Sequence, residues 1–150
     1  MPKRVRASST ESLEIGQIGE VVCLLKLLRL GIPSNFAHLE KTDILSIHNK
    51  RPVRIQVKST TWRLIDRRGK GRKERWGYHF SVCSGRTPKQ PLTRDDCDIV
   101  ALVAIDIDKV LFKNVELLAG RVTRKIDPKS FTENCEKESW NECVNRDEHL

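Results

Sequence analysis

The chain has 150 residues, 38% of them hydrophobic, which is enough for one domain with a core and too few for two independent domains. Its formal net charge of +8 favours a polyanionic partner, nucleic acid in particular. The five cysteines have no Cys-x-x-Cys spacing, and no segment approaches the roughly 20 apolar residues that cross a bilayer. These features indicate neither a disulfide framework, a zinc site nor a membrane protein, so a cytoplasmic location is expected.

The first predicted element is an amphipathic helix from Ser9 to Leu30. Its apolar residues lie at positions 13, 15, 18, 21, 22, 24, 25 and 28, which is an amphipathic helix pattern. The opening Ser-Thr-Glu-Ser is typical of a helix start, and Gly31 followed by Pro33 is typical of a helix end.

A β-hairpin is predicted next, with strands over 43–48 and 53–58 and a turn at Asn49-Lys50-Arg51-Pro52. In this register Asp43 lies opposite Lys58. Side chains alternate between the two faces of a strand, so Gln56 shares a face with Lys58, and paired residues share a face as well. The hairpin alone is therefore expected to bring together an acid, an amide oxygen and a lysine, which is the geometry of a metal-dependent phosphodiesterase.

The remaining elements complete an α/β domain. Residues 60–64 continue extended, 77–83 form a strand, 98–105 form an apolar central strand covered on both faces, 110–113 form a short neighbour, and about 132–146 form a terminal helix. Asp95, Asp96 and Asp98 precede the central strand and are interpreted as turn and cap residues. This order predicts a single domain with a mixed β-sheet flanked by helices.

Positive charge is concentrated in one segment of the chain. Residues 50–76 hold eleven Lys or Arg against two acids, whereas the last twenty residues hold six acids against two cations. The basic loop within about 62–76 directly follows the hairpin and contains glycines, so it can follow a DNA groove. The residues expected to contact DNA are Arg63, Arg67, Arg68, Lys70, Arg72, Lys73 and Arg75, with Ser59 and Thr60 as further phosphate contacts.

With Glu20 in the first helix, Asp43 and the triplet Gln56-Val57-Lys58 resemble the PD-(D/E)XK nuclease superfamily. The matching segment runs from Gly16 to Thr60. The small size, the Gly-x-x-Gly-Glu helix and the Gln-Val-Lys triplet together are most similar to the group I intron homing endonuclease of a cyanobacterial transfer-RNA intron. The resemblance implies a restriction-endonuclease-like core. The chain departs from the pattern where Thr42 replaces Pro and Gln56 replaces the usual acid, which removes one negative charge from the metal site.

The resemblance gives each residue a role in Mg²⁺-dependent hydrolysis of double-stranded DNA, with Mn²⁺ as a substitute cation. Asp43, the Gln56 side-chain oxygen and the Val57 carbonyl are expected to bind the metal, and Glu20 binds it directly or through water. Lys58 is expected to hold the attacking water or neutralise the scissile phosphate. Glu11 and Glu14 remain rivals of Glu20 as the helix acid.

Cutting two strands with one site per subunit calls for at least a dimer, and the resemblance implies a tetramer. Two other functions stay open. The chain can be a Holliday-junction resolvase or restriction-type nuclease on the same core. It can also be a catalytically inactive DNA-binding module with a nuclease fold, a possibility that Gln56 keeps open.

Overall fold

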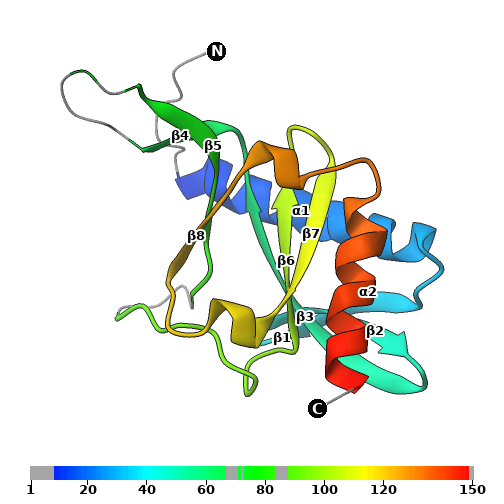
Figure 1. Cartoon of the computed structure of the whole chain (residues 1–150). Helices are drawn as coiled ribbons and strands as arrows, with labels where there is room; N and C mark the ends of the chain where they lie inside the picture. The colour runs from blue at the N-terminus through cyan, green and yellow to red at the C-terminus, as the bar shows by residue number, and fades with distance from the viewer. Residues whose placement is uncertain (1–8, 67–70, 72, 84–87, 149–150) are drawn as a thin grey trace.

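The computed structural model describes residues 9–66, 71, 73–83 and 88–148 (Figure 1). Among these residues, no helix is both long and apolar enough to cross a membrane. The elements in chain order are α1 (Ser9–Arg29), β1 (Ser34–Leu39), β2 (Thr42–His48), β3 (Arg51–Thr60), β4 (Arg63–Asp66), β5 (Arg75–Ser81), β6 (Ile99–Ala104), β7 (Lys109–Asn114), the 3₁₀ helix η1 (Val115–Leu118), β8 (Thr123–Ile126), the 3₁₀ helix η2 (Pro128–Ser130) and α2 (Cys135–Glu148).

A five-stranded mixed sheet forms the centre of the molecule, in the order β1-β2-β3-β6-β7. Within this sheet only β3 and β6 pair parallel, and the other three pairs of neighbouring strands are antiparallel. All six residues of β6 are buried, as the sequence predicts for a strand covered on both faces. The mixed α/β architecture expected from the sequence is confirmed.

Two different layers cover the two faces of this sheet. One core cluster joins the sheet to both α-helices, through Cys23 and Leu27 of α1 and Trp140 of α2. The other cluster joins the opposite face to residues of β5 and β8, including Tyr78. There β4, β5 and β8 form a second, three-stranded sheet. The helices therefore pack on the same face of the central sheet, and a small β-layer replaces a helical layer on the other.

The β2–β3 hairpin is tighter than the sequence suggests. His48 pairs with Arg51, so the loop consists only of Asn49 and Lys50, both with positive φ, 50° and 62°. A two-residue loop with two positive φ angles matches the twist of antiparallel strands. The register also pairs Ile44 with Ile55, which places Asp43 beside Gln56 rather than opposite Lys58. The predicted register was wrong by two residues, but a shift of two leaves every side chain on its expected face.

Helix α1 approaches β3 closely at one glycine. A Cβ atom added to Gly19 would lie 1.6 Å from Ser59 Oγ and 2.7 Å from Ser59 Cβ. Only glycine therefore fits at this crossing without movement of the strand. The predicted helix is confirmed, and the expectation that small residues bring this turn close to the sheet holds at Gly19, whereas Gly16 has no atom within 4 Å of an added Cβ.

We expect Gly19→Ala to lower the free energy of unfolding by about 1–3 kcal/mol, because the new methyl group overlaps Ser59. Gly16→Ala is the matched control on the same helix and should raise stability by roughly 0.5–1 kcal/mol, since alanine favours the helix and meets nothing there. Urea unfolding measures both changes. In a Ser59→Gly background, Gly19→Ala should cost little, and an undiminished cost there would show that another contact is responsible.

Candidate active site

Asp43 is held at the start of β2 by the backbone of β3. One of its carboxylate oxygens, Oδ2, accepts a hydrogen bond of 2.8 Å from the Val57 amide. Burial raises the pKa of Asp43, while the Val57 amide and the charge of Lys58 act in the opposite direction. The structure thus supplies a partly desolvated carboxylate next to Gln56 and the Val57 peptide.

Lys58 lies on the same face of β3 as Gln56, directed towards the second sheet layer. Its Nζ donates a hydrogen bond of 2.9 Å to the carbonyl oxygen of Cys83, just beyond β5. Burial lowers the pKa of Lys58, and the nearby charge of Asp43 acts to raise it. An anchored, partly buried ammonium group of this kind sheds its proton more readily than a lysine in water.

Glu20 reaches the same region from the other face of the sheet. It follows Gly19, whose contact with Ser59 fixes this turn of α1 against β3. Burial and the neighbouring charge of Asp43 raise the pKa of Glu20, and His38 acts to lower it. Of the three candidate helix acids, Glu11 and Glu14 are exposed and only Glu20 is half-buried.

His38 is a neighbour of the site that the sequence analysis missed. It lies in β1 with a positive φ of 51°, where the register with β2 shifts between Phe36 and Leu39. Most β1 side chains are exposed, so the sequence has no alternating apolar pattern that would predict this strand. Without β1, nothing in the sequence connects His38 with Glu20.

Gln56 carries the feature that best tests whether the site suits a metal ion. Its Oε1 atom is buried and has no hydrogen-bond partner among the described residues. An unsatisfied buried acceptor is costly, and a bound cation or water removes that cost. The described residues contain no group of three or more His, Cys, Asp and Glu side chains that could hold a metal. The donors present are instead Glu20, Asp43, the Gln56 amide oxygen and the Val57 carbonyl, an all-oxygen set that fits Mg²⁺ or Mn²⁺.

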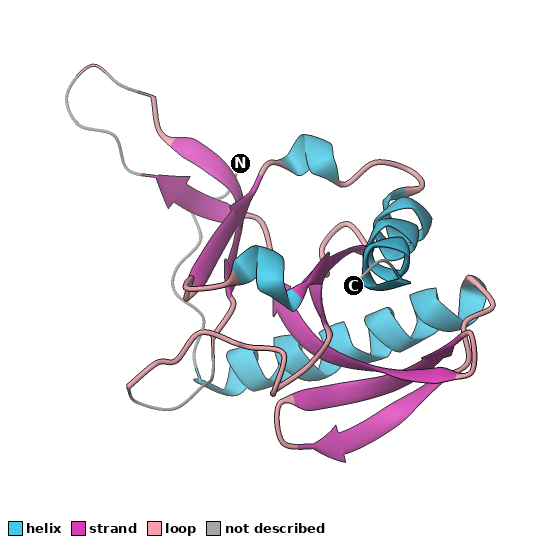
Figure 2. Ribbon diagram, turned by 60° about the horizontal axis from the view of Figure 1, so that its bottom comes forward, coloured by secondary structure: helices cyan, strands magenta, loops and turns pink. Residues whose placement is uncertain are grey.

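The residues expected to contact DNA are only partly described. The basic segment joins β4 to β5, which pair antiparallel, and the loop end of this hairpin projects beyond the part of β5 that pairs with β8 (Figures 1 and 2). Lys73 and Arg75 are exposed and Arg63 opens β4, whereas Arg67, Arg68, Lys70 and Arg72 lie outside the described residues. The Ser59 side chain lies against α1, and Thr60 is buried. The DNA contacts expected of these two residues stay predictions.

The aspartates before β6 have structural partners. Asp96 accepts a hydrogen bond from the Thr93 amide, as the turn interpretation expects. Asp98 forms ion pairs with Arg54 and Arg94. These contacts bind the start of β6 to β3, far along the strand from Lys58.

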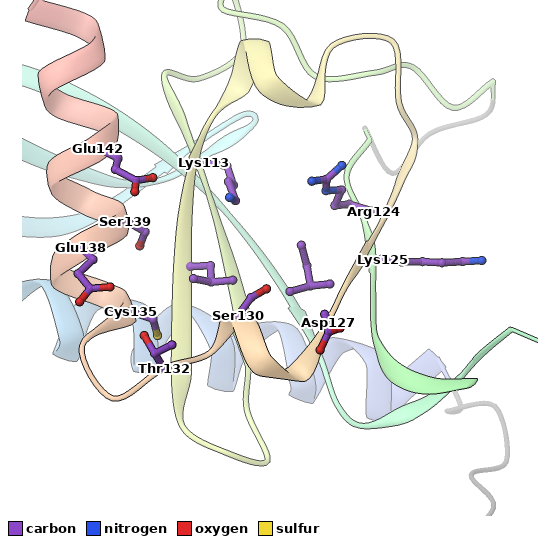
Figure 3. A pocket seen from close by; sticks show the side chains of 12 residues that line it. Lys113, Arg124, Lys125, Asp127, Ser130, Thr132, Cys135, Glu138, Ser139 and Glu142 are labelled. Carbon is purple, nitrogen blue, oxygen red and sulfur yellow. The ribbon is translucent and has the colours of Figure 1, made fainter. Parts of the chain in front are cut away.

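Two pockets lie apart from these residues. The first, about 310 Å³, lies between β7, β8 and α2; Figure 3 shows Lys113 and Arg124 directed into it and Lys125 directed away. Asp127, Glu138 and Glu142 also line it, so its three acids balance its three cations. The second, about 590 Å³, lies beside the β2–β3 turn. Neither pocket is lined by a predicted catalytic residue.

Comparisons with known proteins give a likeness in fold. No protein-family model matches the chain, and no curated protein sequence does. The fold is similar to the solved structure of a bacterial homing endonuclease, I-Ssp6803I, with a TM-score of 0.66 and 13% identity over 95% of this chain and 98% of that one. The resemblance inferred from the sequence is therefore confirmed at the level of the fold.

Asp43→Asn is expected to stabilise the metal-free protein at pH 7 by roughly 1 kcal/mol, because active-site charges are commonly held at a cost to stability. Folding raises the pKa of this acid above 3.8, so the folded state binds its proton more tightly and the charge lowers stability as pH rises through that range. The gain over the parent should accordingly vanish near pH 3.5. Thermal unfolding at pH 3.5, 5 and 7 measures it.

Asp96→Asn is the control of opposite sign. Burial acts to raise the pKa of Asp96, but hydrogen bonds from the Thr93 amide and Lys41 hold it below 3.8. That charge stabilises the fold, so Asp96→Asn should destabilise the protein at pH 7 and lose its effect in acid. Identical pH profiles for the two variants would contradict the assignment.

Proposed function

We propose that the chain is a metal-dependent, site-specific endonuclease for double-stranded DNA, of the intron-homing type. The observation that carries the proposal is the convergence of Glu20, Asp43, Gln56 and Lys58 from α1, β2 and β3. Two acids, an unpartnered amide oxygen and a partly buried lysine suit hydrolysis of a phosphodiester. Likeness in fold to a homing endonuclease supports the same reading.

The acids and the amide would hold Mg²⁺, or Mn²⁺ in its place. When bound, such a cation polarises the phosphate and lowers the pKa of a coordinated water. Asp43 is already oriented by the Val57 amide, so little reorganisation is needed when the cation binds. The second acid, Glu20, would supply negative charge that Gln56 lacks.

Lys58 would act on the water and on the scissile phosphate. Its Nζ has three N–H donors, and one of them binds the Cys83 carbonyl. The remaining donors can orient the attacking water and stabilise negative charge that grows on the phosphate oxygens. Attack of that water would form a new phosphorus–oxygen bond and break the bond to one bridging oxygen. One proton of the water would reach the leaving oxygen through solvent, so that it departs as a hydroxyl, and the other would stay on the new phosphate oxygen.

Recognition of the target would fall to the β4–β5 hairpin and its basic loop. The exposed Lys73 and Arg75 lie at the loop end of the hairpin, beyond the part of β5 that pairs with β8 and packs in the core. Cutting both strands would require at least two subunits, and the expected assembly is a dimer or tetramer. A DNA-binding module that does not cut is the second candidate, favoured by Gln56 in place of an acid.

The direct test is cleavage of duplex DNA in Mg²⁺ by the parent protein, Lys58→Ala and Asp43→Ala. Each substitution should lower the rate by at least about 10²–10³-fold, since each removes a group that stabilises the transition state. Lys125→Ala, an exposed lysine on β8, is the control and should retain parental activity. Binding measured in Ca²⁺ separates loss of chemistry from loss of affinity.

Each of the other possible results would assign a different function or mechanism. Parental DNA binding with no cleavage in Mg²⁺ or Mn²⁺ would establish the non-cleaving module. Preference for four-way junctions over linear duplex would establish a resolvase. Full activity in Lys58→Ala would remove Lys58 from the mechanism.

Gln56→Glu should tighten Mg²⁺ binding by about tenfold, because a carboxylate adds a negative charge at an oxygen that now lacks a partner. Calorimetric titration with Mg²⁺ measures the affinity without reference to cleavage. Gln56→Leu, which removes the oxygen while keeping similar volume, should weaken binding. Equal affinities in all three proteins would exclude Gln56 as a ligand.

A further inference from the structure

Helix α1 carries an apolar stripe on the side that faces away from the sheet. Ile18, Val21, Leu25 and Leu28 are 50%, 58%, 41% and 50% exposed. They recur at intervals of three, four and three residues, the spacing of a helix–helix seam. The opposite side of the helix already packs on the core, so this stripe is additional to what folding of one chain uses.

Charges bracket the stripe with opposite signs at its two ends. Glu11 and Glu14 lie before it, and Arg29 lies after it. Lys26 is already engaged with Asp108 and Glu136 of the same chain. Glu14 and Arg29 are both exposed, so each is accessible to a second molecule.

Two copies of α1 placed antiparallel match these features. With the two-fold axis at Val21 and Val22, Ile18 of each copy lies opposite Leu25 of the other. The same register places Glu14 opposite Arg29 at both ends of the contact. A parallel arrangement would bring Glu14 against Glu14 and Arg29 against Arg29, which is unfavourable.

We infer that the outer face of α1 is a homodimer interface, formed by antiparallel contact with α1 of a second copy. A two-fold contact of this kind is self-complementary, as closed homo-oligomers require. The inference rests on the proposed function only in that a double-strand cut calls for two subunits; the stripe and its charges carry it independently. The same contact would join the two helices that bear Glu20, so it would fix the separation of the two active sites.

Sedimentation velocity of the full chain tests the interface. The parent should sediment with at least twice the mass of one chain, and Leu25→Glu should weaken the dimer by 100-fold or more, since it buries two unpaired charges. Leu117→Glu is the matched control: Leu117 is 47% exposed but lies on η1, so its dimer should persist. Circular dichroism checks that both variants remain folded.

Charge reversal tests the antiparallel register. Glu14→Arg and Arg29→Glu should each weaken the dimer by about tenfold at low ionic strength, and the double variant should restore it. A parent tetramer that Leu25→Glu reduces to dimers would also support the interface. A monomeric parent, an unaffected Leu25→Glu, or a double variant no better than the singles would overturn the inference.

Failure here and failure of the proposed function are separable. A monomer that nicks one DNA strand in a Lys58-dependent manner would overturn the α1 interface and leave the nuclease intact. A dimer that obeys the charge reversal but never cuts DNA would overturn the nuclease and leave the interface intact.

Discussion

The approach of α1 to β3 at Gly19 is the contact on which the candidate site depends. Any side chain larger than hydrogen at this position meets Ser59, so the helix can lie this close to the strand only with glycine. Glu20 is the next residue. Because the helix lies so close to the strand, the charge of Asp43 acts on Glu20 and raises its pKa. A helix lifted from the sheet at this turn would separate the two acids and would also loosen the core contacts that Leu27 makes with the sheet.

The site holds polar groups that the fold alone does not satisfy. Burial disfavours the charged forms of Asp43, Glu20 and Lys58, and Gln56 Oε1 has no partner in the described chain. By contrast, Asp98 is satisfied by two arginines at the other end of the sheet. A bound cation and a phosphate would supply the missing partners around Asp43, which is why we propose the function for that cluster and not for the residues around Asp98.

Local patterns explain what the sequence predicted well. The helix, the hairpin and the buried strand β6 follow from periodicity and from turn residues within a few positions. The hairpin register failed because Asn49 and Lys50 both adopt positive φ, and a lysine in that conformation gives no sequence signal. Strands β1 and β8 were not predicted, because their side chains are mostly exposed or charged. Their positions depend on pairing with strands that are distant in the sequence.

The register error shows which part of a site prediction is robust. A slip of two residues preserved the face of Asp43, Gln56 and Lys58, whereas a slip of one would have turned the lysine into the helical layer.

The sequence could not predict from which face of the sheet the second acid, Glu20, approaches Asp43. Gln56 and Lys58 face the second sheet, while Gly19 meets Ser59 on the opposite face of the same strand. The acids can meet because Asp43 lies at the start of β2, beside the Val57 amide, rather than in the middle of the pair. In the proposed mechanism, this end of the strand is therefore where groups from both faces of the sheet would act on one phosphate.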